Sequence, residues 1–226
     1  SGRQYDFTGW CWSGRNLYTT GSASQTNRCI VNITDCTFDD VNLETDGIDA
    51  RIFNNNINYL HVDYGVIIAN DVNYIKVSHE FSNNSTDSIL IIANYECDIE
   101  ITTYHYVWLY NNYIYDNDDS YALQIHDMND GNDNYNIIAN NTIFSYNSEG
   151  AEVEYHSNTK ITNNYFHQGT NNRAWALRSA GSSNGTPFVS YNYANHAGSN
   201  NHNQTNIPYG LEYNCFGACQ NGNYSL

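Results

Sequence analysis

The sequence is poor in basic residues, in proline and in long apolar runs, and each scarcity excludes a class of protein. Eight lysines and arginines stand against 24 aspartates and glutamates, which gives a net charge of −16. A chain this acidic repels phosphate backbones, so nucleic acid is excluded as an expected partner. It also disfavours polyuronate substrates unless bound cations reverse the local potential. No apolar run reaches the roughly 18 residues that a membrane-spanning helix needs, so no membrane span is predicted.

Residues that favour helices are also scarce, whereas asparagine and tyrosine are abundant. The 226 residues include 38 asparagines and 21 tyrosines. Asparagine and β-branched residues both disfavour helix interiors. The two prolines stand at 187 and 208, so residues 1–186 contain no obligatory break in strand pairing. An all-β fold of a single domain is therefore expected.

A short strand with alternating apolar residues recurs along the chain, at 47–51, 65–69, 89–93, 122–126, 150–154, 175–178 and 210–212. A second strand follows most copies, at 31–38, 73–77, 98–101, 135–143 and 159–166. Asn-Asn pairs at 54–55, 83–84, 111–112, 140–141 and 163–164 are suited to left-handed corners and stacked amide ladders. This repeat predicts a right-handed parallel β-helix, a solenoid of about seven to nine coils.

Over about residues 28–214, these strands resemble those of the pectate-lyase-like superfamily of right-handed parallel β-helices. The resemblance implies the architecture and leaves the activity open, because this fold hosts lyases, hydrolases, adhesins and structural rods. We expect residues 1–27 to form an aromatic, cysteine-bearing N-terminal cap, residues 28–214 the β-helix, and residues 215–226 a cysteine-bearing tail.

The six cysteines are even in number, which favours disulfides and an oxidising, extracellular location for the protein. The residues concerned are Cys11, Cys29, Cys36, Cys97, Cys215 and Cys219. Six cysteines allow fifteen pairings, so the connectivity stays open. Zinc is the competing interpretation, but the spacing Cys215-x-x-x-Cys219 has no second pair to complete a ligand set.

Two groups of residues are candidates for acid–base catalysis. The segment Glu44-Thr-Asp46-Gly-Ile-Asp49 is similar to the Asn-Thr-Asp-Gly-x-Asp segment of polygalacturonase-like hydrolases, which implies acid–base roles for Asp46 and Asp49. The hydrolases' other motifs are absent here. The second group ends successive copies of the repeated strand, and we expect it to form one outward column, with His156 nearby: His126, Glu154, Arg178 and Glu212. The region 152–178 is similar to β-helical polysaccharide lyases, but His156 stands where they use a lysine. The competing interpretation is a solvated ladder of compensating charges.

Two further features suggest binding. Asp127, Asp130 and Asp133 lie in an oxygen-rich loop that could hold calcium, although surface turns have the same composition, and no cofactor is required by the sequence. A dense aromatic run is suited either to stacking on a glycan or to contact with another subunit: Tyr104, Tyr106, Trp108, Tyr110, Tyr113 and Tyr115.

Glycosylation sequons begin at seven asparagines, about the number that chance gives in so asparagine-rich a chain: Asn32, Asn83, Asn84, Asn140, Asn184, Asn203 and Asn223. Together, the incomplete catalytic motifs and the aromatic, cysteine-bearing ends favour a non-catalytic extracellular structural protein that self-associates into a filament or surface layer. The alternatives are a secreted polysaccharide hydrolase or lyase, and a glycan-binding adhesin module.

Overall fold

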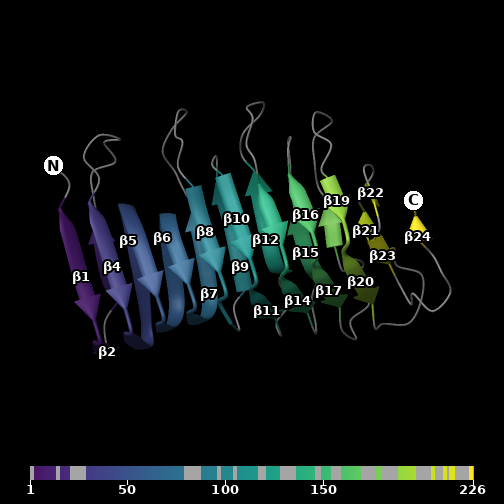
Figure 1. Ribbon diagram of the computed structural model, residues 1–226. Helices are drawn as coiled ribbons and strands as arrows, with labels where there is room; N and C mark the ends of the chain where they lie inside the picture. Colours follow the sequence, from purple (N-terminus) through teal and green to yellow (C-terminus); the bar gives the residue numbers. More distant parts are fainter. Residues whose placement is uncertain are drawn as a thin grey trace.

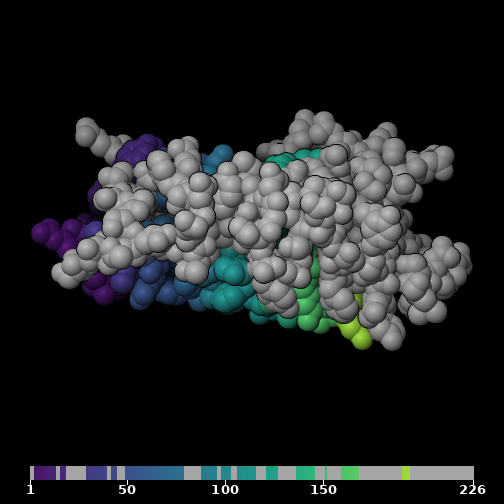
Figure 2. All heavy atoms as spheres, turned by 90° about the horizontal axis from the view of Figure 1, so that it is seen from above, coloured from purple at the N-terminus to yellow at the C-terminus, as the bar shows by residue number. Residues whose placement is uncertain are grey.

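The structure is a computed structural model, and it describes residues 3–13, 16–20, 29–78, 88–95, 98–103, 106–116, 121–127, 136–145, 149–153, 159–168, 177–179, 188–196, 205–206, 211–212, 214–216 and 224–225, in some strands by their backbone alone. These residues form a parallel β-helix, an elongated stack of coils with the N-terminus at one end (Figure 1). Every described strand pair is parallel except β23 with β24. Seen from above, the coils follow one another along the long axis from purple to green (Figure 2). The described part of the chain holds no helix that could cross a membrane.

Each coil contributes strands to three faces of the stack, which we call faces 1, 2 and 3 in the order in which the chain visits them. Three long strands bend from one face to the next, and they join the faces into continuous sheets: β5 (Thr37–Phe53), β6 (Asn56–Ile68) and β7 (Asp71–Ser78). The other strands each belong to one face.

Face 1 contains β1 (Gln4–Thr8), β4 (Ile30–Thr34), β8 (Ser88–Ile92), β10 (Tyr106–Tyr110), β13 (Ile137–Ala139), β16 (Lys160–Thr162), β19 (Phe188–Ser190) and β22 (Leu211–Glu212). Face 2 contains β2 (Cys11–Ser13), β11 (Tyr113–Asp116), β14 (Thr142–Ser145), β17 (Tyr165–Gln168), β20 (Tyr193–His196) and β23 (Asn214–Phe216), with β24 (Tyr224–Ser225) beside β23. Face 3 contains β3 (Leu17–Thr20), β9 (Asp98–Thr103), β12 (Tyr121–Asp127), β15 (Glu149–Val153), β18 (Leu177–Ser179) and β21 (Thr205–Asn206).

The core is a set of columns of branched aliphatic side chains, because alternate residues of each strand point inward and the parallel register places them one above another. One column on face 1 begins with the partly buried Phe7 and continues through seven buried side chains: Ile33, Ile52, Ile67, Ile91, Leu109, Ile138 and Ile161. Each buried aliphatic side chain of this size contributes about 1.5–3 kcal/mol relative to its exposed state. The sequence therefore maintains the stack by keeping one alternating apolar pattern on every face.

The corner between faces 1 and 2 is sharp, and its first residue has a left-handed backbone in every described coil. Gly9 has a φ of 70°, and the non-glycine residues at this position have φ between 55° and 58°: Asp35, Asn54, Ala69, Ala93, Asn111, Asn140, Asn163 and Tyr191. Non-glycine residues adopt this conformation at a cost of about 1 kcal/mol, so something else in the corner must favour it.

The second corner residue supplies that stabilisation through a buried ladder of asparagine amides. The ladder consists of Asn55, Asn70, Asn94, Asn112, Asn141, Asn164 and Asn192. Asn112 is representative: its Nδ2 donates to Ile91 O, Tyr110 O and Asn141 Oδ1 at 2.9–3.0 Å. Its Oδ1 accepts from the backbone N–H and the Nδ2 of Asn94. Because each amide satisfies backbone groups of its own coil and of a neighbouring one, the ladder holds the coils in register.

The predicted all-β parallel β-helix is confirmed, and so is the role of the Asn-Asn pairs at 54–55, 111–112, 140–141 and 163–164 as left-handed corners that bear an amide ladder. The pair at 83–84 lies outside the described residues. Ala69 and Ala93, which the repeat places at the ends of strands, are themselves corner residues.

Candidate functional site

The predicted catalytic column is not a single column in the structure. His126 lies on face 3 in register with Thr102, and Arg178 lies on face 3 in register with Glu152 rather than with Glu154. Glu212 lies on face 1, beside Ser190. The prediction of one column is therefore wrong, because the strands of faces 1 and 3 share the same alternating pattern and are indistinguishable by that pattern alone. Glu154 and His156 lie outside the described residues, and only the backbone of Arg178 is described.

Face 3 instead carries a polar cluster around Glu100. Lys76 Nζ lies 3.3 Å from Glu100 Oε1, and the Tyr74 hydroxyl donates a hydrogen bond to Glu100 Oε2. The ring of Tyr74 stacks on that of Tyr59 with centroids 5.3 Å apart. One strand away, His61 Nε2 lies 2.6 Å from Ser78 Oγ. Apart from the stacked tyrosines, each contact joins chemically complementary side chains on neighbouring strands: Glu100 with Tyr74 and Lys76, and His61 with Ser78.

The electrostatics of this cluster are compensating. Burial by itself raises the pKa of Glu100, but the hydrogen bond from Tyr74 and the charge of Lys76 together hold it below its usual value. Burial, followed by the contact with Glu100, raises the pKa of Tyr74. Burial also raises the pKa of Tyr59, with the charges of Glu44 and Glu100 adding to the effect. The contacts of the cluster therefore favour an ionised Glu100 carboxylate and neutral Tyr59 and Tyr74 phenols.

Asp46 and Asp49 lie on opposite sides of a bend in β5. Asp46 pairs with Thr20 on face 3, whereas Asp49 pairs with Ile30 and Tyr64 on face 1. Asp49 Oδ2 lies 3.6 Å from the Arg51 guanidinium on the same strand. The side chain of Asp46 is not described. Their role in acid–base catalysis stays a prediction.

Three of the six cysteines are described with their side chains, and all three are free thiols: Cys11, Cys29 and Cys36. A disulfide among these three is therefore not part of the structure. Cys36 has a different role, since it occupies the position of the ladder asparagine in its coil. Its Sγ lies 3.3 Å from Thr34 O and accepts the Trp10 N–H at 3.4 Å, while its own N–H donates to Asn55 Oδ1. Cys97 and Cys219 and the side chain of Cys215 lie outside the described residues.

The aromatic run that the sequence singles out is divided between two faces by the corner at Asn111. Tyr106, Trp108 and Tyr110 point outward from face 1, and Tyr113 and Tyr115 belong to face 2. Tyr104 lies outside the described residues. The run therefore does not form a single platform, although its second half contributes to a larger feature.

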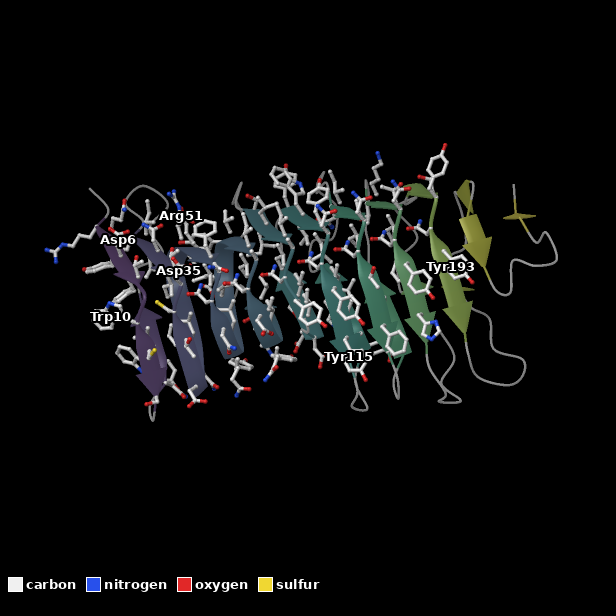
Figure 3. The ribbon with its side chains drawn as sticks, turned by 60° about the horizontal axis from the view of Figure 1, so that its bottom comes forward. Asp6, Trp10, Asp35, Arg51, Tyr115 and Tyr193 are labelled. Carbon is white, nitrogen blue, oxygen red and sulfur yellow. The ribbon has the colours of Figure 1, made fainter. Side chains whose placement is uncertain are left out.

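That feature is an aromatic surface on the C-terminal half of face 2, which we call the tyrosine stripe. Its first row, in register from coil to coil, consists of Tyr95, Tyr113, Thr142, Tyr165 and Tyr193. Its second row consists of Tyr115, Phe144 and His167. Figure 3 labels Tyr115 and Tyr193, which project outward from face 2. Tyr95 is 50% exposed, Tyr113 37% and Tyr165 38%, so this surface is open to solvent.

The rings of the stripe stack on one another along the long axis. The centroids of Tyr95 and Tyr113 are 5.1 Å apart with planes 21° apart, and those of Tyr165 and Tyr193 are 5.1 Å apart with planes 1° apart. In the second row, Phe144 stacks on Tyr115 at 5.4 Å and on His167 at 4.5 Å. Burial raises the pKa of Tyr165, with the neighbouring Tyr193 adding to it. The stripe therefore presents ring edges and hydroxyls to solvent, while most ring faces cover one another.

A sequence signal accompanies the first row, although the dipeptide concerned, Asn-Tyr, also occurs at 58–59, 73–74, 134–135 and 223–224. Each of its tyrosines directly follows an asparagine of the amide ladder, so the dipeptide Asn-Tyr occurs at 94–95, 112–113, 164–165 and 192–193. Since the ladder fixes the corner, the next residue is the first outward position of face 2 in every coil.

Only some residues of the predicted calcium and glycosylation sites lie within the described part of the chain. Only the backbone of Asp127 is described, and Asp130 and Asp133 lie outside the described residues. In the described part of the chain, no group of three or more histidine, cysteine or acidic side chains could hold a metal ion. Of the sequon asparagines, Asn32 lies on β4 and hydrogen-bonds Asp6, and Asn140 is an exposed corner residue. Asn83, Asn84, Asn184, Asn203 and Asn223 lie outside the described residues.

Comparisons of this chain with protein-family models, with curated proteins and with solved structures found no match.

Proposed function

We propose that the protein is a non-catalytic extracellular structural β-helix whose copies associate side by side through the tyrosine stripe, building a filament or a surface layer. The observation that carries this proposal is the stripe itself, an exposed aromatic surface on the parallel sheet of face 2. Contiguous exposed apolar patches of this kind mark interaction sites on soluble proteins. Tyrosine is enriched at such sites because its ring buries apolar area and its hydroxyl keeps a hydrogen-bonding partner.

The distribution of charge supports self-association through this surface in particular. Two copies, each with a net charge of −16, repel one another over most of their surfaces. The described side chains of the stripe include no carboxylate, ammonium or guanidinium group. Approach through the stripe therefore brings together described side chains none of which is a carboxylate.

The geometry of the rings favours a protein partner over a flat glycan platform. Sugars stack on exposed ring faces, whereas most ring faces of the stripe are covered by the neighbouring coil. The polar cluster of face 3 supports a structural role as well. The Glu100 carboxylate already holds both Tyr74 and Lys76, which leaves it poorly suited to exchange protons with a substrate.

Sedimentation velocity of the whole chain tests this proposal. We expect wild-type protein to form species larger than a monomer, and the associated fraction to grow as the salt concentration rises from about 20 mM to about 500 mM, because salt screens the repulsion between copies. The double variant Tyr113→Ser/Tyr165→Ser should stay monomeric throughout. Trp108→Ser is the matched control, since Trp108 is as exposed as Tyr113 but lies on face 1.

Two results would contradict the proposal. One is wild-type protein that stays monomeric at every salt concentration. The other is a double variant that associates as strongly as wild type, which would place the contact elsewhere. Circular dichroism of each variant establishes that the β-helix is retained, which we expect because both tyrosines point outward.

A further inference from the structure

The first row of the tyrosine stripe has one position without a ring. Tyr95 and Tyr113 form a stacked pair on one side, and Tyr165 and Tyr193 form a stacked pair on the other. Between them stands Thr142, whose strand pairs directly with Tyr113 and with Tyr165. From Tyr95 to Tyr193, Thr142 alone interrupts the stack of this row. Tyr113 and Tyr165 each stack on a ring on the side away from Thr142, and their other ring faces are directed toward the space over Thr142.

The size of this gap follows from the spacing of the coils. Neighbouring strands lie about 4.8 Å apart, so Tyr113 and Tyr165, two strands apart, are separated by roughly 10 Å. That is twice the 5.1 Å between the centroids of the stacked pairs in the same row. A gap of this width accepts a single planar ring, which then lies about as far from each tyrosine as the tyrosines of a pair lie from one another.

We propose that the gap over Thr142 is a docking slot for one aromatic side chain of a second copy of this chain. This inference rests on the proposed function and names the contact through which the stripe acts. An inserted ring completes a continuous stack from Tyr95 to Tyr193 and covers both open ring faces at once. The Thr142 hydroxyl at the base of the slot offers a hydrogen-bonding group to a phenol.

A second copy is the occupant that the composition and the charge favour. The chain is 15% aromatic and carries 21 tyrosines, so each copy has abundant rings to donate. The slot lies within the stripe, whose described side chains include no carboxylate, so two acidic copies can meet there without placing carboxylates of the stripe against one another. A basic partner would be attracted by the net charge, but its binding would weaken with added salt, whereas association between copies strengthens.

The variant Thr142→Tyr tests the slot directly, because it fills the gap with a ring of the same chain. We expect this variant to keep the β-helix and to lower the association constant by at least about tenfold, since the inserted ring loses its stacking on two faces. Thr102→Tyr is the matched control, because Thr102 points outward from face 3. Thr142 also completes the sequon of Asn140, so every version is produced without glycosylation.

A second readout uses p-cresol, the free analogue of a tyrosine side chain, with dilute protein whose tyrosine rings carry ¹³C. Titration should shift the ring signals of Tyr113 and Tyr165, assigned through their phenylalanine variants, and these shifts should vanish in Thr142→Tyr. Two results would contradict the docking slot while leaving association through the stripe intact. One is a Thr142→Tyr variant that associates as strongly as wild type, and the other is p-cresol shifting both ring signals in that variant as much as in wild type. If wild type never associates, the proposed function itself fails.

Discussion

At the scale of single residues, the fold depends on side chains that form hydrogen bonds to backbone groups at the corners. The ladder amides each satisfy backbone groups in two coils, and Cys36 performs a reduced version of this role with a thiol. The left-handed residue before each ladder amide varies among Asn, Ala and Tyr, because the corner is stabilised by its second residue. Only the asparagine of the second position is needed to continue the ladder.

Substitution of one ladder residue tests this account. Asn112 is 2% exposed, and Asn112→Ala leaves Ile91 O and Tyr110 O without their amide donor and the Asn94 N–H without its acceptor. Since each unsatisfied buried group costs about 1–3 kcal/mol, we expect the free energy of unfolding to fall by about 3 kcal/mol or more. Asn73→Ala is the control, because its amide bonds Asn58 at the surface, and it should change stability by less than about 0.5 kcal/mol. Urea unfolding measures both, and equal losses would contradict the account.

How much the sequence predicts at this scale depends on which corner residue is considered. The Asn-Asn pairs predict corners because both residues fit their positions, and four of the five pairs are found at corners. Ala69 and Ala93 give no such signal, since alanine rarely adopts a left-handed backbone and its place there depends on the amide that follows. Cys36 is likewise missed, because a cysteine in an acidic, asparagine-rich chain suggests a disulfide before it suggests a substitute amide.

At the scale of elements, the strands are predictable but their assignment to faces is not. Faces 1 and 3 both show apolar residues at every second position, and the loops between them vary in length. His126 and Glu212 therefore look like copies of one strand although they lie on different faces. The register is set by the pairing of the strands within face 3, and it aligns Arg178 with Glu152. The predicted catalytic residues therefore do not form one column. The polar side chains that face 3 does bring together are those around Glu100, whose charge is balanced by Lys76.

The face 3 cluster makes the free energy of unfolding fall as the pH becomes alkaline. The pKa of Tyr74 is raised in the folded state, so the unfolded chain loses this proton first as the pH rises above about 10, and folding stability falls from there. Below that pH the contribution is fully present. In Tyr74→Phe the fall in unfolding free energy above pH 10 should be smaller than in wild type, whereas Tyr18→Phe, which removes an exposed hydroxyl, should follow wild type. Urea titrations from about pH 8 to 11 measure this difference, and parallel curves for all three proteins would refute it.

At the scale of the whole molecule, the variable length of the coils hides the tyrosine stripe from a search along the sequence. Successive ladder residues from Asn94 to Asn192 are separated by 18, 29, 23 and 28 residues. The tyrosines that follow them therefore show no fixed period, and they align only once the coils are stacked. The net charge, by contrast, is plain from composition.

The central claim is that copies meet through the stripe, and mapping of dityrosine cross-links tests it most directly. A mixture of ¹⁴N- and ¹⁵N-labelled copies is photo-oxidised at high salt, and links between copies are recognised by mass spectrometry from their mixed isotopes. We predict that these links join Tyr95, Tyr113, Tyr165 and Tyr193. Exposure alone predicts links at Tyr18 and Tyr191, which are each 58% exposed, ahead of Tyr113 and Tyr165, which are 37% and 38% exposed. Mixed-isotope links confined to Tyr18 and Tyr191, or no such links at all, would contradict the account.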